Sequence, residues 1–553
     1  MPRPDAWTFE LTADAGAVSR RLAGWTAEEF ADRLWQNDHT IWSSEPRPEL
    51  ADRLGWLDLP HSMPEVTGLL TDFAEETRGS GIETIVLCGM GGSSLAPETF
   101  AAVFGPREGF PRLLVLDSTH PGAVRAVSDA IEPGRTLFLI ASKSGTTLET
   151  LSFFRYFWQL TARALAEPGD RFAAITDSGS ALEELAVKRG FQRVFNAPAD
   201  VGGRFSALTY FGLVPAALIG LDPARLLERA ADAAALTRSD NGRIGGDALA
   251  LGAALGEMAL TGRDKVTFFT SPSLAAYPDW LEQLIAESTG KQGRGIVPVA
   301  GEPPGELDTY GSDRFFVAIE LAGESDAELD RRLNELVAAG HPVVRIRLDG
   351  KEELAGSMFD FEFAVAAAGA VLHINPFDQP DVQLAKDLAR RAMAGELEGS
   401  GEICEETTGN PAALRSALDT WLGSLATGDY LGLQAYLAPH PAVSDRLHDL
   451  AGRLRDATGA ATTTGFGPRF LHSTGQLHKG GPNAGLFLQL VDEPAEALPV
   501  PETDFDFRTL IAAQSRGDYL ALRQRERRVV RVSLGTEPEA GLEVVESELE
   551  ALL

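Results

Sequence analysis

Two stretches of the sequence place hydroxyl side chains and glycine directly after an apolar run. One is ASKSGTTLET, Ala141 to Thr150, which follows the run RTLFLI. The other is CGMGGSSLAPE, Cys88 to Glu98, which has three glycines. In a parallel α/β sheet, the loop after a strand leads into a helix whose first N–H groups lack partners and favour an anion. Together the two stretches predict a phosphate site, whereas either one alone is also typical of an ordinary Ser/Thr helix cap.

Nucleotide binding is disfavoured by the same residues. A dinucleotide fingerprint needs glycine at the position of Ser94, and the pair Gly290-Lys291 is followed by Gln292 instead of the Ser or Thr of a P-loop. Two hydroxyl-rich loops fit one phosphate monoester better than a pyrophosphate. We therefore expect a phosphate monoester as the ligand.

A carboxylate and several cations occur in three further motifs. Glu287 lies in DWLEQLIAESTGKQG, Arg204 in VGGRFSALTYFG and Lys386 in NPFDQPDVQLAK. A carboxylate base and a nearby positive group are what proton removal beside a carbonyl requires. Each residue also has a structural alternative: Glu287 could pair with Lys291 on a surface helix, Arg204 could bond loop carbonyls, and Lys386 could be an exposed charge.

Composition limits the classes of partner. Lys and Arg number 49 against 80 Asp and Glu, for a formal net charge of −31 at pH 7. This balance argues against nucleic acid or an anionic membrane as a partner. The two cysteines suit a reducing compartment and offer no metal-ligand spacing. The start of the sequence lacks signal-peptide features, and the apolar run Phe363 to Leu372 is too short to span a bilayer. We expect a cytoplasmic protein without a metal or cofactor.

The chain of 553 residues is too long for one hydrophobic core. From Ile82 onward, short β-branched runs alternate with helical stretches, a pattern typical of parallel sheets covered on both faces. The predicted fold class is α/β, with two similar units in tandem. The predicted domains are a helical N-terminal segment (1–79), a first α/β domain with the phosphate loops (80–225), a second with Glu287 and Lys386 (226–400) and an α+β C-terminal unit (401–553).

These motifs, in this order, resemble the glucose-6-phosphate isomerase family of the sugar-isomerase-domain superfamily. The chain is also similar to the isomerase half of fused transaldolase–isomerase proteins, although it contains no transaldolase barrel. The resemblance implies two tandem sugar-isomerase domains. It further implies interconversion of D-glucose 6-phosphate and D-fructose 6-phosphate through ring opening and a cis-enediolate, without a cofactor, in glycolysis and gluconeogenesis.

The resemblance also assigns roles to single residues. Glu287 is the implied base that moves a proton between C1 and C2, Arg204 stabilises the enediolate, and Lys386 helps to open the ring. The implied substrate contacts are Gln283 and Gln379, and the implied phosphate contacts are Gly92, Ser93, Ser142, Lys143, Ser144, Thr147 and Thr150.

The sequence departs from the family pattern in one important place. The family's ring-opening histidine lies between the base and the lysine, where this chain has Asp313 in YGSDRFFVAIEL and no histidine. We predict that His478 in STGQLHKGG takes this role, which would make the C-terminal unit a wall of the site. His472 and His373 are the alternatives. Thr289 also replaces the asparagine of better-known members.

Other functions remain as competing hypotheses. A related isomerase could act on mannose 6-phosphate or an amino sugar phosphate, and a sugar-phosphate sensor could bind without turnover. Glutamine-dependent synthesis of an amino sugar would need a glutaminase domain with a cysteine at its N-terminus, and residues 2 to 10 contain none. Sugar-phosphate sensors usually carry a basic DNA-binding helix–turn–helix, and the acidic N-terminal segment argues against one. A homodimer and a functional association with a transaldolase are left open.

Overall fold

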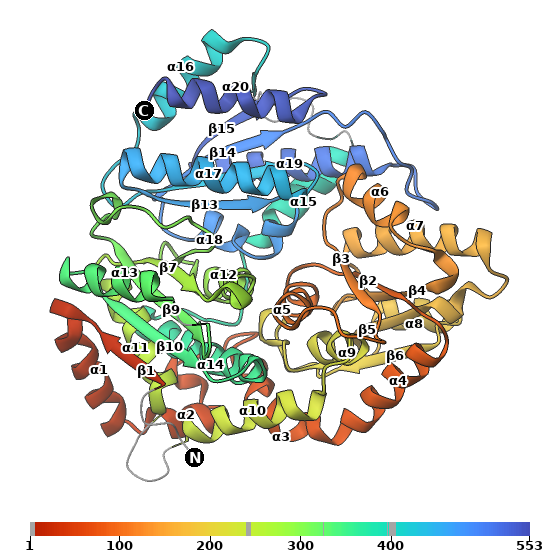
Figure 1. The fold of residues 1–553 in the computed structure, drawn as a ribbon, viewed down its shortest axis with the longest axis horizontal. Coiled ribbons are helices and arrows are strands. Elements are labelled where there is room, and N and C mark those ends of the chain that lie inside the picture. Colours follow the sequence, from red (N-terminus) through yellow and green to blue (C-terminus); the bar gives the residue numbers. More distant parts are fainter. Residues whose placement is uncertain (1–5, 239–244, 325, 395, 397–404) are drawn as a thin grey trace.

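The computed structural model describes residues 6–553 except 239–244, 325, 395 and 397–404. Within these residues, the strands form three five-stranded sheets, each at the centre of an α/β unit. We name them the first unit (residues 82–220), the second unit (residues 246–372, joined by β1) and the third unit (residues 405–553). Figure 1 shows the three units arranged around a common centre. The predicted boundary at residue 400 lies outside the described residues.

The first unit contains the sheet that was expected to carry the phosphate loops. Its strands pair in parallel in the order β3-β2-β4-β5-β6. Every residue of the central strands β2 and β4 is buried, because helices cover both faces of the sheet. The strands are β2 (Thr84–Cys88), β3 (Arg112–Leu116), β4 (Thr136–Ala141), β5 (Phe172–Asp177) and β6 (Arg193–Ala197). The helices are α5 (Leu95–Phe104), α6 (Pro121–Asp129), α7 (Leu148–Ala164), α8 (Ala181–Arg189) and α9 (Tyr210–Leu218).

The second unit has the strand order β8-β7-β9-β10-β1. Its own four strands are parallel, whereas β1 (Trp7–Glu10) pairs antiparallel with β10. The prediction of a purely helical N-terminal segment is therefore wrong at β1, whose four residues close the edge of this sheet. The other strands are β7 (Lys265–Thr270), β8 (Val297–Val299), β9 (Arg314–Leu321) and β10 (Val343–Leu348). The helices of this unit are α11 (Gly246–Leu260), α12 (Tyr277–Thr289), α13 (Ala327–Ala338) and α14 (Leu354–Leu372).

Five helices of the N-terminal half lie beside these two sheets. The first four belong to the predicted helical segment, and the fifth packs on α14. They are α1 (Ala15–Ala27), α2 (Phe30–Trp35), α3 (Leu59–Ser62), α4 (Thr67–Gly79) and α10 (Pro223–Leu236).

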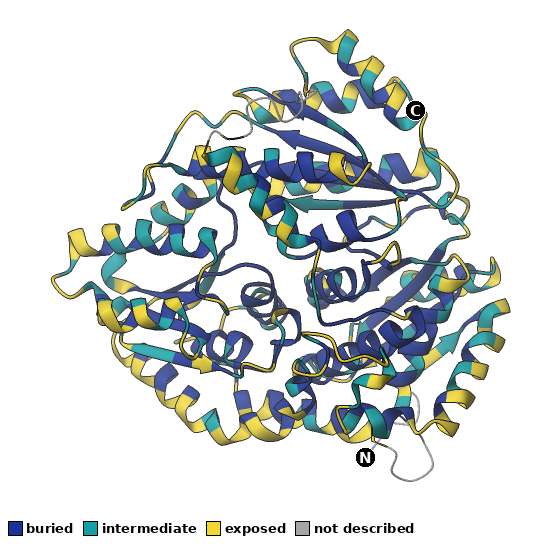
Figure 2. Cartoon of the chain, turned by 180° about the vertical axis from the view of Figure 1, so that it is seen from behind, coloured by how far each residue is buried: buried dark blue, intermediate teal, exposed yellow. Residues whose placement is uncertain are grey.

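Helix α14 forms the apolar centre of the second unit. The segment Lys351–Leu372 is the one described helix that is long and apolar enough to cross a membrane. However, 94% of its most apolar window is buried inside the structure, where α10, α11 and α12 contact it. Figure 2 shows this helix as part of the buried interior. Its apolar composition is therefore accounted for by the core.

The third unit is α/β and not α+β, which corrects the prediction for this region. All its strand pairs are parallel, in the order β13-β12-β14-β15-β11. In each of the three sheets, one strand (β2, β7 or β12) lies between the two strands that follow it in sequence. The strands are β11 (Glu405–Thr407), β12 (Tyr430–Tyr436), β13 (Ala461–Phe466), β14 (Gly485–Val491) and β15 (Arg528–Ser533). The helices are α16 (Pro411–Leu422), α17 (Pro441–Thr458), α18 (Gly475–Gly480), α19 (Phe507–Gln524) and α20 (Pro538–Glu550).

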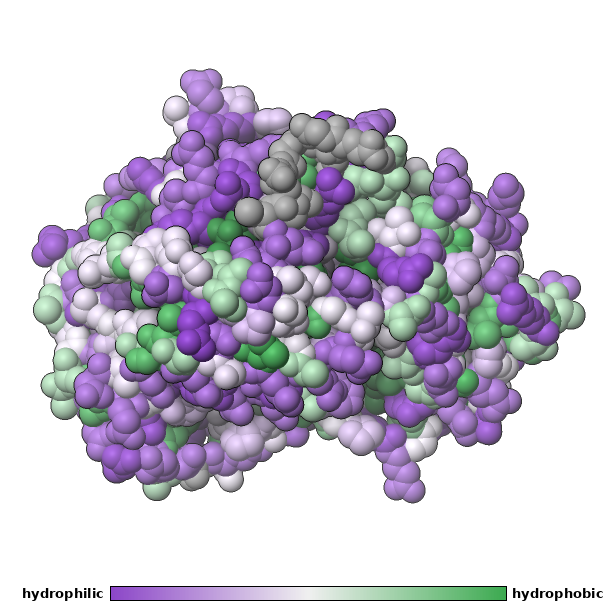
Figure 3. Space-filling model, turned by 90° about the horizontal axis from the view of Figure 1, so that it is seen from above, coloured by the Kyte–Doolittle hydropathy of each residue, from purple (hydrophilic) through white to green (hydrophobic). Residues whose placement is uncertain are grey.

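Apolar contacts hold the third unit against the other two. Leu498 and Phe507 share a buried cluster with Phe153 of α7, and Phe487 of β14 shares another with Ala286 of α12. Helix α15 (Val382–Met393) packs closely on α19, since a Cβ at Gly517 would lie 2.6 Å from a backbone nitrogen of α15. Hydrophilic residues cover most of the outer face in Figure 3, with apolar ones scattered among them, as the net charge leads one to expect.

Candidate active site

The two predicted phosphate loops leave neighbouring strands at the same edge of the first sheet. Cys88 at the end of β2 lies opposite Ile140 near the end of β4. The first loop continues through a 3-10 turn (Gly91–Ser93) into α5, and the second leads into α7. Neither Ser94 nor Thr147, which precede the two helices, caps its helix with its own side chain. The helix N-termini are therefore available to an anion.

Hydroxyl groups line the second loop. Ser142 Oγ lies 2.9 Å from Thr147 Oγ1 and accepts a hydrogen bond from the Gly145 N–H at 3.1 Å. Ser144 Oγ lies 3.0 Å from Thr146 Oγ1. These pairs bring Ser142, Ser144 and Thr147 together in one short loop, as the sequence suggested.

The remaining predicted phosphate residues have varied surroundings. Ser93 is nearly buried in the first loop, and Thr150 Oγ1 is buried without a hydrogen-bond partner among the described residues. Lys143 Nζ is bonded to Asp177 Oδ2 at 2.7 Å and to the Ala199 carbonyl at 3.2 Å. Its ammonium group is therefore held by β5 and the chain that follows β6.

Gly92 places the phosphate loop directly on the turn that carries Arg204. A Cβ at Gly92 would lie 2.0 Å from the Gly203 carbonyl oxygen, so no larger residue fits without moving backbone. Arg204 belongs to a 3-10 turn, Gly203–Phe205, that follows β6. This close approach fixes the distance between the anion loop and the arginine.

Arg204 is 2% exposed and holds several pieces of chain together. Its Nε donates to Ser288 Oγ at 2.7 Å, and its Nη1 donates to Gln379 Oε1 at 3.1 Å. Its Nη2 donates to the carbonyls of Pro376 and Asp378 at 2.6 and 3.0 Å. Arg204 thus bonds loop carbonyls, as the structural alternative proposed, while its charge also faces the predicted base.

Glu287 lies on α12 with only 9% of its surface exposed. Its Oε1 is 3.5 Å from Arg204 Nη1, and its Oε2 accepts a hydrogen bond from Gln283 Nε2 at 3.2 Å. Gln283 Nε2 also donates to the His472 carbonyl at 2.8 Å, and its Oε1 is buried with no partner among the described residues. The structure therefore brings the predicted base, arginine and glutamines together.

Lys291 does not form the surface pair with Glu287 that the alternative interpretation required. Its Nζ bonds Asp378 Oδ1 at 2.9 Å, and its side chain is 1% exposed. Burial and the charge of Arg204 lower the pKa of Lys291 to about 8, despite the opposing effect of Asp378 and Glu287. A second cationic side chain therefore lies near Glu287, the predicted base.

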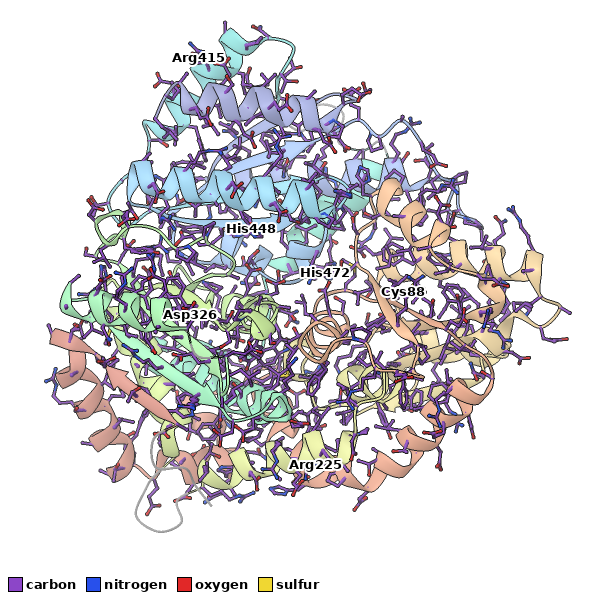
Figure 4. The ribbon with its side chains drawn as sticks, in the orientation of Figure 1. Cys88, Arg225, Asp326, Arg415, His448 and His472 are labelled. Carbon is purple, nitrogen blue, oxygen red and sulfur yellow. The ribbon has the colours of Figure 1, made fainter. Side chains whose placement is uncertain are left out.

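The third unit reaches this site through His472, which ends the 3-10 turn Arg469–His472. His472 Nε2 lies 3.1 Å from Glu149 Oε1 on α7, and Gln514 Nε2 also donates to this oxygen at 2.7 Å. Burial would raise the pKa of Glu149, but the charge and hydrogen bond of His472 and the charge of Lys386 outweigh it, so the pKa falls to about 2. Figure 4 shows His472 near the centre, between the units.

The other two histidines lie elsewhere. His478 is buried in the third unit between the rings of Phe470 and Phe487, with Nδ1 3.2 Å from Gln434 Nε2. Burial and the charges of neighbouring cations lower the pKa of His478 well below its usual value. His373 is exposed at the end of α14. Of the three, His472 is the one bonded to residues of the phosphate-loop helix and of α12.

Lys386 and Glu149 depart from the sequence expectation in different ways. Lys386 is exposed on α15, the helix that packs on the third unit, and it acts on Glu149 through its charge. Glu149 was not among the predicted site residues, although it stands between Thr147 and Thr150 in the phosphate loop motif. Among the described residues there is no cluster of His, Cys, Asp and Glu that could hold a metal ion.

Comparison with known proteins gives consistent matches. The family model for phosphoglucose isomerase matches residues 66–294. The glucose-6-phosphate isomerase of Rubrobacter xylanophilus is 29% identical over 431 residues, which cover 69% of this chain and 96% of the relative. The enzyme of the same name from Mycoplasmopsis pulmonis is 30% identical over 381 residues, which cover 60% of this chain and 88% of the relative.

Solved structures agree with these matches. A hypothetical protein from Thermus thermophilus superposes with a TM-score of 0.60 at 25% identity, covering 70% of this chain and 100% of that protein. A glucose-6-phosphate isomerase from Chlamydia trachomatis shares the fold, with a TM-score of 0.53 at 20% identity over 67% of this chain and 78% of that one. On the sequence matches, the chain belongs to the phosphoglucose isomerase family.

Proposed function

We propose that this chain is an aldose–ketose isomerase that interconverts D-glucose 6-phosphate and D-fructose 6-phosphate through a cis-enediolate. The observation that carries the proposal is the Arg204–Glu287 pair, which lies against the glycine loop of a two-loop anion site. This arrangement combines a phosphate anchor, a base and a cation. Those three parts are what isomerisation of a sugar phosphate requires without a cofactor.

The phosphate dianion would bind at the N-termini of α5 and α7. The backbone N–H of Gly92 and the hydroxyls of Ser93, Ser142, Ser144 and Thr147 would supply its hydrogen bonds. Thr150 stands one turn further along α7, and Lys143 adds positive charge from its place beside Asp177. Anchoring the phosphate at this edge would extend the sugar chain toward Glu287.

In the proton-transfer step, Glu287 takes the C2 proton of the open-chain aldose and returns it to C1. The electrons of the C–H bond form the enediolate, whose oxygen charge is stabilised by Arg204 and by the nearby charge of Lys291. The O2 hydroxyl proton passes to O1 before C1 is protonated, which leaves the carbonyl at C2. Gln283, with its unpartnered Oε1, and Gln379 are proposed to bond sugar hydroxyls. Arg204 contacts the Glu287 carboxylate at 3.5 Å, longer than a tight charge-assisted bond, which leaves Oε1 without a close hydrogen bond from the arginine.

For ring opening, we assign His472 in place of His478. Its bond to Glu149 fixes the orientation of the imidazole, which would pass a proton to the ring oxygen. The bond between that oxygen and the anomeric carbon then breaks, and the anomeric hydroxyl loses its proton to water and becomes the carbonyl. Lys386 is proposed to assist from α15. His478 lacks such access, since it is enclosed by aromatic rings within the third unit.

One chain contributes all the groups named above, so this scheme needs no second subunit. A homodimer, a functional association with a transaldolase and a cytoplasmic location are further proposals, which rest on the family resemblance. The acidic composition argues against a nucleic-acid or membrane partner, as noted above.

The test is a coupled assay with fructose 6-phosphate that follows glucose 6-phosphate through its dehydrogenase. Wild type should turn over, Glu287→Gln should lose roughly 10²–10⁴-fold in kcat, and His472→Ala should be slowed. His478→Ala, a matched removal of a buried imidazole, should retain kcat if folded. An inactive wild type would contradict the function, and slowing by His478→Ala alone would return ring opening to His478.

A further inference from the structure

Arg469 is a cation outside the proposed reaction machinery, and it lies at the start of the turn that carries His472. The turn Arg469–His472 belongs to the third unit, but the guanidinium reaches two carboxylates of the first unit. It forms ion pairs with Glu98 on α5 and, at 3.3 Å, with Asp117 after β3. The side chain of Asp117 is only 8% exposed, so this pair is largely shielded from water.

The turn has further contacts that fix His472 from other directions. Its imidazole bonds Glu149, and its backbone carbonyl accepts from Gln283. A Cβ at Gly91 would lie 2.7 Å from both the His472 carbonyl oxygen and Gln283 Nε2. The glycine loop, α12 and the third unit are therefore closely packed at this point.

Asp117 also connects this ion pair to the phosphate loop. Its Oδ2 accepts a hydrogen bond from Ser94 Oγ at 3.2 Å, and Ser94 Oγ lies 3.1 Å from the Gly91 carbonyl. Asp279 on α12 is a further carboxylate whose charge acts on Arg469. One arginine thus neutralises carboxylates from the first two units while its own backbone belongs to the third.

We propose that Arg469 is a positioning residue for ring opening: its ion pairs with Glu98 and Asp117 hold the turn so that His472 faces the sugar ring. This role rests on the proposed function. It does not require Arg469 to touch substrate. Because Arg469 and His472 are the first and last residues of one short turn, a shift of that turn moves the imidazole directly.

The experiment compares two quantities in Arg469→Ala. One is kcat for fructose 6-phosphate, which must be opened. The other is the Kd of 5-phospho-D-arabinonohydroxamate, a linear analogue of the enediolate that needs the phosphate loops and Arg204 but no ring opening. We expect kcat to fall about 10- to 100-fold, the cost of a misplaced catalytic group, and Kd to change less than about twofold. Arg469→Lys should restore part of kcat, since one of the two pairs can re-form.

A matched control is Arg125→Ala, which removes another ion pair between the first and third units, with Glu496. It should leave both quantities unchanged. His472→Ala should reproduce the separation of kcat from Kd. An unchanged kcat in Arg469→Ala, or a Kd that weakens by the same factor as kcat, would overturn the positioning role. If Arg469→Ala does not fold, the same two measurements on Arg469→Lys decide. An inactive wild type would instead overturn the proposed function and this role with it.

Discussion

The guanidinium of Arg204 lies 3.5 Å from the carboxylate of Glu287 while four hydrogen bonds hold it to Ser288, Gln379 and two backbone carbonyls. Most of the N–H groups of this guanidinium therefore already donate to protein acceptors. The cation cannot swing onto Glu287 as a tight two-bond pair, so the positive charge stays close to the carboxylate without engaging both of its oxygens. Rigid placement of this kind costs no reorganisation during the reaction.

Arg204→Lys should therefore reduce kcat by about 10²–10³-fold, because lysine keeps the charge but cannot make the planar set of bonds. The steady-state rate with fructose 6-phosphate measures this. Arg225→Lys, on an exposed arginine of α10, is the control and should change nothing. A kcat above about a tenth of wild type would show that charge alone is enough.

Gly92→Ala should impair the phosphate loop. The added methyl would lie 2.0 Å from the Gly203 carbonyl, so the loop or the Arg204 turn must move. We expect a loss of about 1–3 kcal/mol in stability, typical of overpacking, and a raised KM. Gly24→Ala on α1 is the matched control, since nothing lies within 4 Å of its added methyl. It should stabilise the helix by about 0.5–1 kcal/mol and leave KM alone. A normal KM in Gly92→Ala would contradict the close-packing argument.

Lys291 should give the activity an alkaline limb near pH 8. Its pKa is lowered to about 8, so its charge beside the enediolate site is lost above that pH. In Lys291→Met this limb should be absent and kcat low throughout. The stability of the folded chain should change with pH in the opposite direction to the activity. Between about pH 8 and 10.5 the unfolded chain still holds the Lys291 proton while the folded chain has lost it. The free energy of unfolding should therefore rise with pH across this range. A pH–kcat profile identical in wild type and variant would exclude this assignment.

Glu362 should destabilise the folded chain by an amount that depends on pH. It is fully buried on α14, neither carboxyl oxygen has a hydrogen-bond partner among the described residues, and burial raises its pKa well above the usual 4.5. The folded state therefore holds a proton that the unfolded chain releases, and stability falls as pH rises above about 4.5. Glu362→Met should raise the unfolding midpoint at pH 7 by an amount worth about 1–3 kcal/mol.

Thermal unfolding at pH 5 and pH 8 separates these effects. The gain from Glu362→Met should be larger at pH 8 than at pH 5. A gain for Glu362→Met that is equal at both values would mean that Glu362 does not carry a raised pKa.

The family and the fold class were predictable because their signals are local. A glycine- or hydroxyl-rich loop after an apolar run is recognised within about ten residues, and both loops lie where parallel strands end. Membership of the phosphoglucose isomerase family is confirmed by the relatives. Glu287 and Arg204 were found as motif residues, and the structure then placed them 3.5 Å apart.

The histidine was harder to predict because its environment is tertiary. His472 and Glu149 are 323 residues apart in sequence, and their contact depends on how the third unit docks. The motif STGQLHKGG made His478 the local candidate, but α18 turns that side chain into the aromatic interior. Likewise, β1 is four residues long and owes its strand conformation to pairing with β10, far along the chain.

The docking of the third unit has a consequence for how activity appears in time. The segment with His472 is made late in synthesis, after both anion loops and the α12 carboxylate. Since domains generally fold as units, the N-terminal ones first during synthesis, a nascent chain should acquire affinity for the linear hydroxamate before it acquires turnover. The delay between hydroxamate binding and turnover would measure how long the third unit takes to dock.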